Sequence, residues 1–473
     1  MSGTEDGGKI GRLQARLDGE RAKVRKLVAS QERAAAEQAS LEVGRRGLER
    51  RLAVLESQHD LLIAAQAPGR EPGPPLRVLV VGVMRKTIFE FIEGAMVTGD
   101  PALAPFDVVV IPRPEKRDLA ELARGVPEAV WDAVRSGRTR LVLDGSSEGR
   151  LHRVVLERFR ALAQQTGAPL RDVVYLIQDR LAGRPGACAE ARPDAPVRIV
   201  NYDYYLHKTL LPMLKHGPAA FENRMARYLR APGRGRRAFL TLNLSPRGHR
   251  VLLLARLLRD GLWDRGFVSF GGFGPQFGGD ELASRVNWQG LETAGADVAP
   301  WLPELHRKGA VLFGIRDEAG VDEIARQSLR SADLEEYRLS WFSVVTETEM
   351  TRDQLRVTEK ILKPLLNFHP FVVLGSPGAL RLVRSYGFET FPELFDESYD
   401  DEEDPVRRFD MVYDQVRRLA HMDEAELGRL NASVAEKVVF NARWGMTRLP
   451  GLFQHTLLPA VLERILRAPL GRA

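Results

Sequence analysis

Cysteine is nearly absent from this sequence, whose 473 residues include only Cys188. A single cysteine cannot form an internal disulfide bond or a cysteine-based zinc site, which excludes a disulfide-rich secreted scaffold and a cysteine-based zinc module. Apolar runs long enough to span a membrane are also missing, and the first residues, MSGTEDGGK, lack the apolar region of a signal peptide. We therefore expect a cytoplasmic protein without a transmembrane segment.

A strong excess of one charge is missing as well. The chain has 69 Lys and Arg against 63 Asp and Glu, a net charge of +6 at pH 7, and the two signs are interspersed. Nucleic-acid binding requires a strongly basic face, so we expect no nucleic-acid partner. The composition, 44% hydrophobic and 28% charged, is typical of a globular protein with enough apolar residues for several domain cores.

A dinucleotide-binding fingerprint is the third absence. The loop Gly82 to Lys86 follows a β-branched run, Arg77 to Val83, but contains no G-x-G-x-x-G, so a dinucleotide-dependent oxidoreductase loses its main support. The run itself is typical of a strand buried on both faces of a parallel sheet. Further strands of this kind are predicted at Phe106–Pro112, Thr139–Leu143, Val173–Ile177 and Val197–Asn201, with helices at Asp118–Ser136 and His152–Thr166 between them. This alternation predicts a Rossmann-like domain over residues 76–230.

The residues before this domain form a different kind of segment. Within residues 1–66, the stretch from Lys9 to Gln66 keeps one heptad register, with Leu13, Leu27, Ala34, Leu41, Leu48, Leu55 and Leu62 at one core position. This pattern predicts a coiled coil that joins copies of the chain into a homo-oligomer, although a single long helix packed on its own body is an alternative. Residues 67–75, APGREPGPP, form a linker.

A second linker, Ala231 to Arg237, opens a second Rossmann-like domain over residues 231–450. A helix is expected at Glu424–Phe440 in this domain, and a C-terminal helix within residues 451–473. The strand Ala238–Leu244 is followed by Arg247 and Arg250 at the start of an apolar helix. Asn243, near the end of that strand, and Arg250 are candidate binding residues, since an arginine at a helix start suits a diphosphate. A solvated arginine is the alternative.

The stretch from Ser340 to Gly387 carries most of the remaining candidates. An apolar strand, Leu339–Val345, ends in the polar residues TETE, and helical spacing follows from Val357. The next strand is expected at Phe371–Leu374, and a helix at Ala379–Tyr386. A β-α-β-α pattern predicts a parallel sheet with functional groups at its strand ends. The candidates are Glu347, Thr358, Glu359 and Lys360.

Two segments of this stretch, FSVVTETE and VTEKILKPLLNFHPFVVLG, resemble the donor-binding core of two-domain (GT-B) nucleotide-sugar glycosyltransferases. The pattern is most similar to that of the α-1,3-fucosyltransferases, where an F-x-x-x-F-E-N-S strand precedes Y-V-T-E-K-L and a P-V-V-x-G strand. The resemblance covers Leu339 to Gly375, and Val357-Thr358-Glu359-Lys360 is its specific part. Arg356 replaces the family's aromatic residue, and Glu347-Thr348-Glu349 replaces E-N-S.

The resemblance implies an activity. An inverting, metal-independent enzyme would transfer a hexosyl- or fucosyl-type sugar from a nucleotide sugar, with GDP as one candidate nucleotide, to a hydroxyl of a glycan or protein acceptor, without a cofactor. It implies that Lys360 and Arg250 neutralise the leaving diphosphate and that Glu359 binds the ribose hydroxyls. Glu347 would hold the ribose or the donor sugar.

A base for such a reaction is sought in the first domain. The loop DGSSEG follows the strand Thr139–Leu143, and Asp144 or Glu148 could accept the proton of the acceptor hydroxyl. An ordinary turn in which Asp and Ser cap the next helix is an equal alternative. The acidic stretch Asp396–Asp404 is expected to be a solvated loop, and the glycine-rich stretch Gly271–Gly279 a mobile one.

A different class of function also fits the sequence. The chain could be a non-catalytic coiled-coil assembly protein whose glycosyltransferase fold is degenerate, since the changes at Arg356 and in the E-N-S motif are those expected of lost chemistry.

Overall fold

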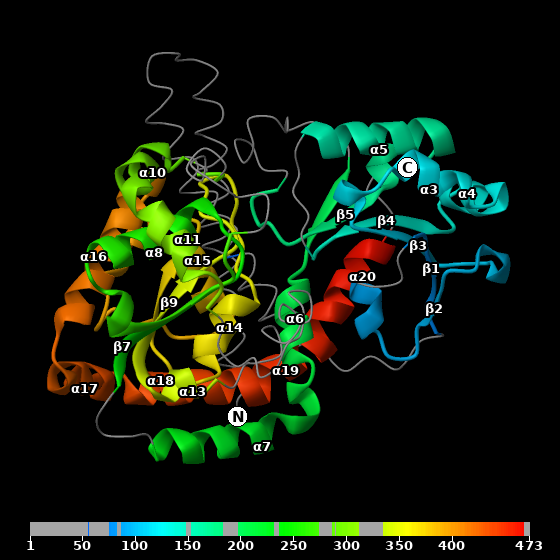
Figure 1. Ribbon diagram of the computed structural model, residues 1–473. Helices are drawn as coiled ribbons and strands as arrows, with labels where there is room; N and C mark the ends of the chain where they lie inside the picture. Colours follow the sequence, from blue (N-terminus) through cyan, green and yellow to red (C-terminus); the bar gives the residue numbers. More distant parts are fainter. Residues whose placement is uncertain are drawn as a thin grey trace, which may run out of the picture. The chain divides into compact units, whose positions relative to one another are not determined.

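The computed structural model describes Leu55 and residues 75–82, 87–147, 153–182, 197–230, 236–273, 286–288, 290–311 and 334–467. The chain divides into two compact units (Figure 1). Unit 1 comprises Met1–Leu211, Asp353–Arg356 and Gly451–Ala473, and unit 2 comprises Pro212–Arg352 and Val357–Pro450. The coiled coil and linker expected over residues 1–75 lie outside the described residues, apart from Leu55 and Pro75.

Unit 1 contains a six-stranded sheet in the order β2-β1-β3-β4-β5-β6, in which every neighbouring pair is parallel. Its strands are β1 (Arg77–Val80), β2 (Met96–Thr98), β3 (Val108–Pro112), β4 (Arg140–Gly145), β5 (Val174–Ile177) and β6 (Arg198–Asn201). Five of them fall in the predicted β-branched runs. The edge strand β2 was not predicted, because three residues are too few to show a period.

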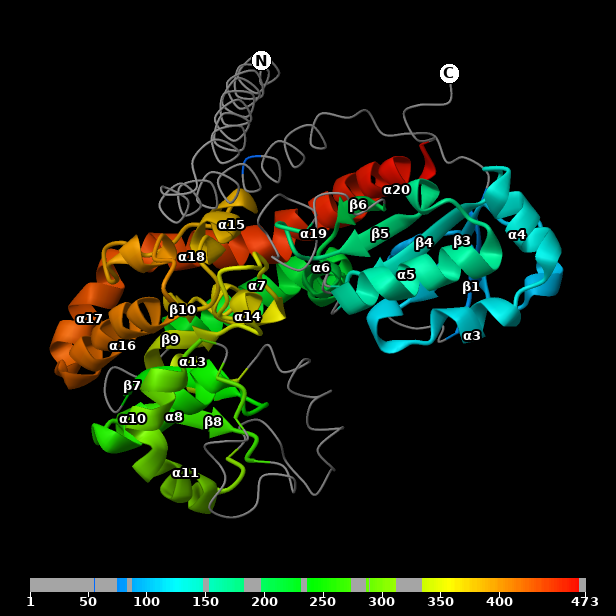
Figure 2. The same cartoon turned by 90° about the horizontal axis from the view of Figure 1, so that it is seen from above.

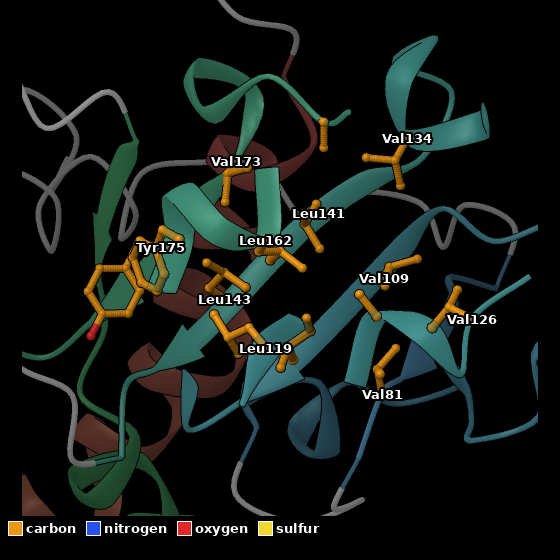
Figure 3. Packing of buried hydrophobic residues seen from close by; sticks show 14 of the residues in the cluster. Val81, Val109, Leu119, Val126, Val134, Leu141, Leu143, Leu162, Val173 and Tyr175 are labelled. Atoms are coloured by element: carbon orange, nitrogen blue, oxygen red, sulfur yellow. The ribbon is translucent and has the colours of Figure 1, made fainter. Parts of the chain in front are cut away.

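Both faces of this sheet are covered, since successive side chains of a strand point to opposite faces. Val78 and Val80 of β1 join one core and Leu79 joins the other. The helices α3 (Leu119–Arg124), α4 (Glu128–Arg135) and α5 (Arg153–Thr166) cover the face of Leu79, and α6 (Tyr204–Leu210) and α20 (Leu458–Leu466) cover the other (Figure 2). Figure 3 shows Leu119 and Leu162 packed over the strands of the first core.

Two long helices of the prediction are each interrupted. The helix expected over Asp118–Ser136 is split into α3 and α4 because Pro127, which lacks an N–H group, starts α4 as its N-cap. The helix expected over Glu424–Phe440 is split at Val434, whose backbone leaves the helical region. The wrong predictions came from apolar spacing that continues across both breaks.

Unit 2 contains a four-stranded parallel sheet in the order β10-β9-β7-β8. Its strands are β7 (Arg237–Asn243), β8 (Gly266–Phe270), β9 (Ser340–Thr346) and β10 (Phe371–Leu374). All seven residues of β9 are buried, as a central strand of a parallel sheet requires. The expected α/β class with parallel sheets is therefore confirmed in both units.

The helices of unit 2 lie around this sheet and at one of its ends (Figure 1). They are α7 (Met213–Leu229), α8 (Gly248–Arg259), α10 (Glu292–Val298), α11 (Leu302–Lys308), α13 (Glu335–Arg338), α14 (Glu359–Leu365), α15 (Ala379–Ser385), α16 (Pro405–His421), α17 (Glu424–Ser433) and α18 (Ala435–Arg443). Two π-helical turns, Trp444–Arg448 and Phe453–Leu457, with α19 (Leu449–Leu452) between them, lead to α20. Helix α14 begins at Glu359, because the preceding residue, Thr358, is extended and caps the helix with its side chain.

Strand order reverses beside the first strand of each sheet. In unit 1, β1 lies between β2 and β3, and in unit 2, β7 lies between β8 and β9. The connections leave such a first strand toward opposite sides, and open parallel sheets bind ligands just beyond the carboxyl ends of the strands at this point. Topology alone therefore directs attention to the ends of β1 and β3 in unit 1 and of β7 and β9 in unit 2.

Buried histidines make stability depend on pH, and His207 of unit 1 and His369 of unit 2 are two of the three among the described residues. His207 of unit 1 donates through Nε2 to Gln454 Oε1 (2.9 Å), and His369 of unit 2 donates through Nε2 to the Ser340 carbonyl (3.0 Å). Burial lowers the pKa of each imidazole to about 4. The folded state therefore resists a proton that the unfolded chain accepts near pH 6.5, so stability is full above that pH and is lost as the pH falls toward 4.

We expect the free energy of unfolding to fall by up to about 3 kcal/mol per histidine between pH 6.5 and 4. Urea unfolding at a series of pH values measures this change. His207→Gln and His369→Gln should each flatten the pH dependence, whereas the exposed His455→Gln should leave it unchanged. Equal slopes in all four proteins would contradict the assignment.

Candidate functional site

The carboxyl ends of β7 and β9 are joined by side-chain hydrogen bonds. Thr346, the last residue of β9, donates through Oγ1 to Asn243 Oδ1 at the end of β7 (2.7 Å). Asn243 in turn donates through Nδ2 to Thr241 Oγ1 (3.1 Å) and to the Ser269 carbonyl of β8 (3.3 Å). Asn243, which is buried, thus links three strands at the point where their order reverses.

Glu347 follows β9 directly, and its carboxylate is bound within the loop that it begins. Oε1 accepts a hydrogen bond from the Thr358 amide (3.0 Å), and Oε2 accepts from Thr358 Oγ1 (2.6 Å) and from the Thr348 amide (3.2 Å). Its side chain is 1% exposed. The two ends of the loop 347–358 are therefore held together by one carboxylate.

Lys360 and Glu359 form the more accessible part of the arrangement. Lys360 Nζ lies 3.0 Å from Glu359 Oε1 and 3.1 Å from both Thr348 Oγ1 and Thr358 Oγ1, with its side chain 27% exposed. Burial alone would raise the pKa of Glu359, but the charge and hydrogen bond of Lys360, helped by the charge of Lys363, hold that pKa below its ordinary value. Glu359 is therefore a carboxylate at neutral pH.

Arg250, the third residue of α8, lies next to the end of β9 and the first residue of the loop that follows it. Its Nη2 donates to the carbonyls of Thr346 (3.3 Å) and Glu347 (3.0 Å), and its Nη1 donates to the Ser245 carbonyl (3.4 Å). The side chain is 3% exposed, and Nε has no hydrogen-bond partner among the described residues. Burial, reinforced by a neighbouring arginine, lowers the pKa of Arg250 to about 10, so the guanidinium stays charged at neutral pH.

His249 donates a second hydrogen bond to the Glu347 carbonyl, which also accepts from Arg250 Nη2. Its Nε2 donates to the Glu347 carbonyl at 2.9 Å. Burial and the charge of Arg250 hold the pKa of His249 well below its ordinary value, so the ring is a neutral donor. The backbone at Glu347 is consequently fixed by two adjacent residues of α8. Sequence reasoning missed His249, although its place beside Arg250 was a usable signal.

An ion pair and a serine hydroxyl also lie at this edge of the unit 2 sheet. Arg247 Nη1 pairs with Glu349 Oε1 (3.1 Å), and the arginine side chain is 36% exposed while the glutamate is almost fully buried. Ser376 lies in the tight loop after β10, and its buried Oγ has no partner among the described residues. A Cβ added to Gly375 would lie 3.4 Å from Glu347 Cβ, so this loop approaches the end of β9 closely.

The structure thus brings six of the eight predicted residues together, and we call them the strand-end cluster: Asn243, Arg250, Glu347, Thr358, Glu359 and Lys360. Five of the six residues are buried, and the accessible side chain of the cluster is that of Lys360, whose ammonium group suits an anionic ligand. Within the described ranges, no group of three or more His, Cys, Asp or Glu side chains is placed to hold a metal ion.

The two predicted bases in unit 1 have different outcomes. Glu148 lies outside the described residues. Asp144 is 0% exposed, and its Oδ2 accepts from Thr87 Oγ1 (2.8 Å) and the Ile88 amide (2.9 Å) while Oδ1 accepts from the Ser146 amide and hydroxyl (3.0 and 2.6 Å). Burial raises its pKa against these four bonds. As the structure stands, the Asp144 carboxylate holds its own loop and the turn at Thr87, and its role as a base stays a prediction.

The acidic stretch Asp396–Asp404 is not simply solvated as predicted. Asp400 is 3% exposed and accepts from the amides of Leu380 (2.9 Å) and Arg381 (3.1 Å) in the first turn of α15. Its negative charge beside a helix start explains why an acidic residue is buried there. Of the expected mobile loop Gly271–Gly279, only residues 271–273 are described.

Comparisons with known proteins give no relative: neither family models, nor curated proteins, nor solved structures yield a match. None of the helices in the described part of the chain combines the length and apolar character needed to cross a membrane.

Proposed function

We propose that the protein is a glycosyltransferase of the GT-B type, in which unit 2 binds a nucleoside-diphosphate sugar and unit 1 serves the acceptor. One observation carries the proposal: the residues expected from the sequence to contact the donor gather at the carboxyl ends of β7 and β9, where the strand order of unit 2 reverses. Open parallel sheets place their ligands at such a point.

The chemistry of the cluster supports a diphosphate as the group bound. Lys360 and Arg247 have partly exposed cationic side chains, and the buried donors Arg250 Nε and Ser376 Oγ lack partners among the described residues. A buried donor left without an acceptor costs about 1–3 kcal/mol. Phosphate oxygens can accept from all four groups, so a bound diphosphate would satisfy both charge and hydrogen bonding.

The proposed reaction is a single displacement at the anomeric carbon of the donor. The acceptor oxygen forms a bond to that carbon as the bond to the phosphate oxygen breaks, and the nucleoside diphosphate leaves with the electron pair. The acceptor proton passes to a carboxylate, for which Glu148 and Asp144 are the candidates. Lys360 and Arg250 stabilise the charge that grows on the leaving oxygen, and Glu359 accepts hydrogen bonds from the ribose.

A nucleotide panel tests the proposal. Thermal unfolding of the full chain is measured with GDP, UDP, CDP and ADP, each at the same concentration. One diphosphate should stabilise the protein well above the others, by about 2.7 kcal/mol at a hundred times its dissociation constant. No stabilisation by any diphosphate, or equal stabilisation by all four, would overturn a specific donor site.

A non-catalytic assembly protein is the second candidate, and one observation favours it. Arg250 and Asp144 are both enclosed, and each is bonded to groups of its own chain. A scaffold that has lost its substrates would retain such bonds because they hold the fold. The same panel separates the two functions, since the scaffold should respond to none of the diphosphates.

A further inference from the structure

An arginine and a tryptophan form a separate polar feature of unit 2, at the amino ends of β7 and β9. Arg236 directly precedes β7, and Trp341 is the second residue of β9. The two strands pair in parallel, with Arg237 opposite Ser340. The extended strand from Trp341 to Thr346, where the strand-end cluster begins, spans about 17 Å. A ligand bound beside Arg236 and Trp341 would therefore occupy a different site from one bound at the strand-end cluster.

The guanidinium group of Arg236 stacks on the indole ring of Trp341. Its Cζ lies 4.3 Å from the ring centroid. Two N–H groups of this stacked pair, Arg236 Nε and Trp341 Nε1, are buried and have no hydrogen-bond partner in the part of the chain that the structure describes. Trp341 as a whole is 8% exposed. A buried donor without an acceptor is unfavourable, so the stacked pair is arranged to receive an acceptor that the described residues do not supply.

The charge of Arg236 also lacks a counter-ion. Over the described ranges, its guanidinium group forms neither an ion pair nor a hydrogen bond. Burial lowers the pKa of Arg236, and the charge of Arg338 adds to this effect, whereas Tyr228 and Glu424 oppose it. Glu424 Oε1 accepts from the backbone amide of Arg236 (3.3 Å) and leaves the side chain unbonded. Arg236 is therefore a partly buried cation whose hydrogen-bonding capacity is unused.

Another stacked arginine of unit 2 shows the usual arrangement. Arg256 lies over the ring of Phe409, with Cζ 5.0 Å from the centroid, and its Nη1 pairs with Asp410 Oδ1 at 2.6 Å. The carboxylate compensates the charge that stacking removes from water. The corresponding acceptor is missing at Arg236.

We propose that Arg236 and Trp341 form a second anion-binding site, which takes an oxyanion, the phosphate or carboxylate group of a small molecule. A guanidinium group donates two parallel hydrogen bonds to such a group, and the indole N–H can donate a third to another oxygen. Stacking on the indole ring holds the guanidinium plane and contributes more as water is excluded. The site does not depend on the proposed function.

The indole N–H of Trp341 reports directly on binding. In the full chain carrying isotope-labelled tryptophan, nitrogen–proton NMR spectra give one indole signal for each of the six tryptophans, and Trp341→Phe identifies the signal of Trp341. Titration with inorganic phosphate or with acetate should move this signal downfield until it saturates, with half of the change at about 1 mM. Response to only one of the two identifies the ligand as a phosphate or a carboxylate.

Three variants test the assignment of the charges. Arg236→Gln should raise the half-saturating concentration about tenfold or more. Glu424→Gln keeps an acceptor oxygen for the Arg236 amide but removes a repelling charge, so it should lower that concentration about threefold. Arg443→Gln is the matched control, because Arg443 also stacks on a ring of unit 2, that of Phe221 (5.1 Å), but is exposed, and its loss should change nothing.

Lys360→Ala separates this site from the proposed donor site, since it removes the accessible cation of the strand-end cluster and should leave the response of Trp341 unchanged. The absence of a saturable movement with either anion would overturn the inference. So would an equal movement in Arg236→Gln, or in sodium chloride of the same ionic strength. Failure of the nucleotide panel would count against the proposed function alone.

Discussion

Replacing Lys360 by alanine is expected to lower the affinity for the preferred nucleoside diphosphate about 10- to 100-fold, because one hydrogen bond between charged groups contributes about 1.5–3 kcal/mol. Lys360 Nζ lies beside Thr348, Thr358 and Glu359 and its side chain is 27% exposed, so a ligand can reach it. A diphosphate is negatively charged both when bound and when leaving, so the loss should appear in binding as well as in turnover.

The variant should keep its fold. Glu359, which loses its partner, still has the nearby charge of Lys363, whose own pKa is lowered to about 8 by burial. Thr358 continues to hold Glu347 through two hydrogen bonds that do not involve Lys360. A loss of affinity in Lys360→Ala can therefore be assigned to the missing ammonium group.

Lys437→Ala is the matched control. Lys437 is also in unit 2, its side chain is likewise 27% exposed, and it also pairs with a glutamate, Glu393, at 2.6 Å. Its removal should leave the dissociation constant unchanged by calorimetry. Equal affinity in wild type and Lys360→Ala would remove the role given to the V-T-E-K segment, and with it the main support for a glycosyltransferase.

The fold class was predictable because parallel strands buried on both faces leave a strong signal. The runs at Val108–Pro112 and Phe371–Leu374 are almost wholly apolar or β-branched. The sequence alone is therefore enough to assign them as strands. What periodicity cannot show is the strand order. The reversal beside β7, which marks the candidate site, depends on pairings between residues about a hundred positions apart.

The cluster was predictable for a related reason. Asn243 and Glu347 each lie at the end of a strand, and the carboxyl ends of parallel strands meet at one edge of a sheet. The direction and burial of each side chain were not predictable. Arg250 was expected to face a ligand, yet its guanidinium is mostly occupied by carbonyl groups, because the loop after β9 folds back over the start of α8.

Arg408 is the most important residue that the sequence analysis did not single out. Its replacement should lower the free energy of unfolding more than any other proposed substitution. Its side chain is 1% exposed, Nε donates to the Gly375 carbonyl (3.0 Å), Nη1 to the Glu402 carbonyl (2.6 Å) and Nη2 to the Met350 carbonyl (3.3 Å). A signal was present in the sequence, since Arg408 falls on the apolar face of α16, four residues before Val412.

In Arg408→Ala, the free energy of unfolding of unit 2 should fall by about 3–5 kcal/mol, because three carbonyls in buried or partly buried bonds lose their donor and a cavity opens. Burial lowers the pKa of Arg408 to about 10, so the native side chain is still charged at neutral pH. Arg408→Lys should recover little, since a single ammonium group cannot reach three carbonyls arranged around a planar fork. Arg407→Ala is the control, because the neighbouring side chain is 75% exposed.

Urea unfolding followed by tryptophan fluorescence measures this change in unit 2, because only Trp131 of the six tryptophans lies in unit 1. Two of the carbonyls that accept from Arg408, those of Met350 and Gly375, belong to the loops after β9 and β10, which both border the strand-end cluster. At urea concentrations where unit 2 remains folded, Arg408→Lys should therefore also bind the diphosphate more weakly. A fall of less than about 1 kcal/mol in Arg408→Ala would mean that water or backbone shifts replace the lost donors and that Arg408 does not fix these loops.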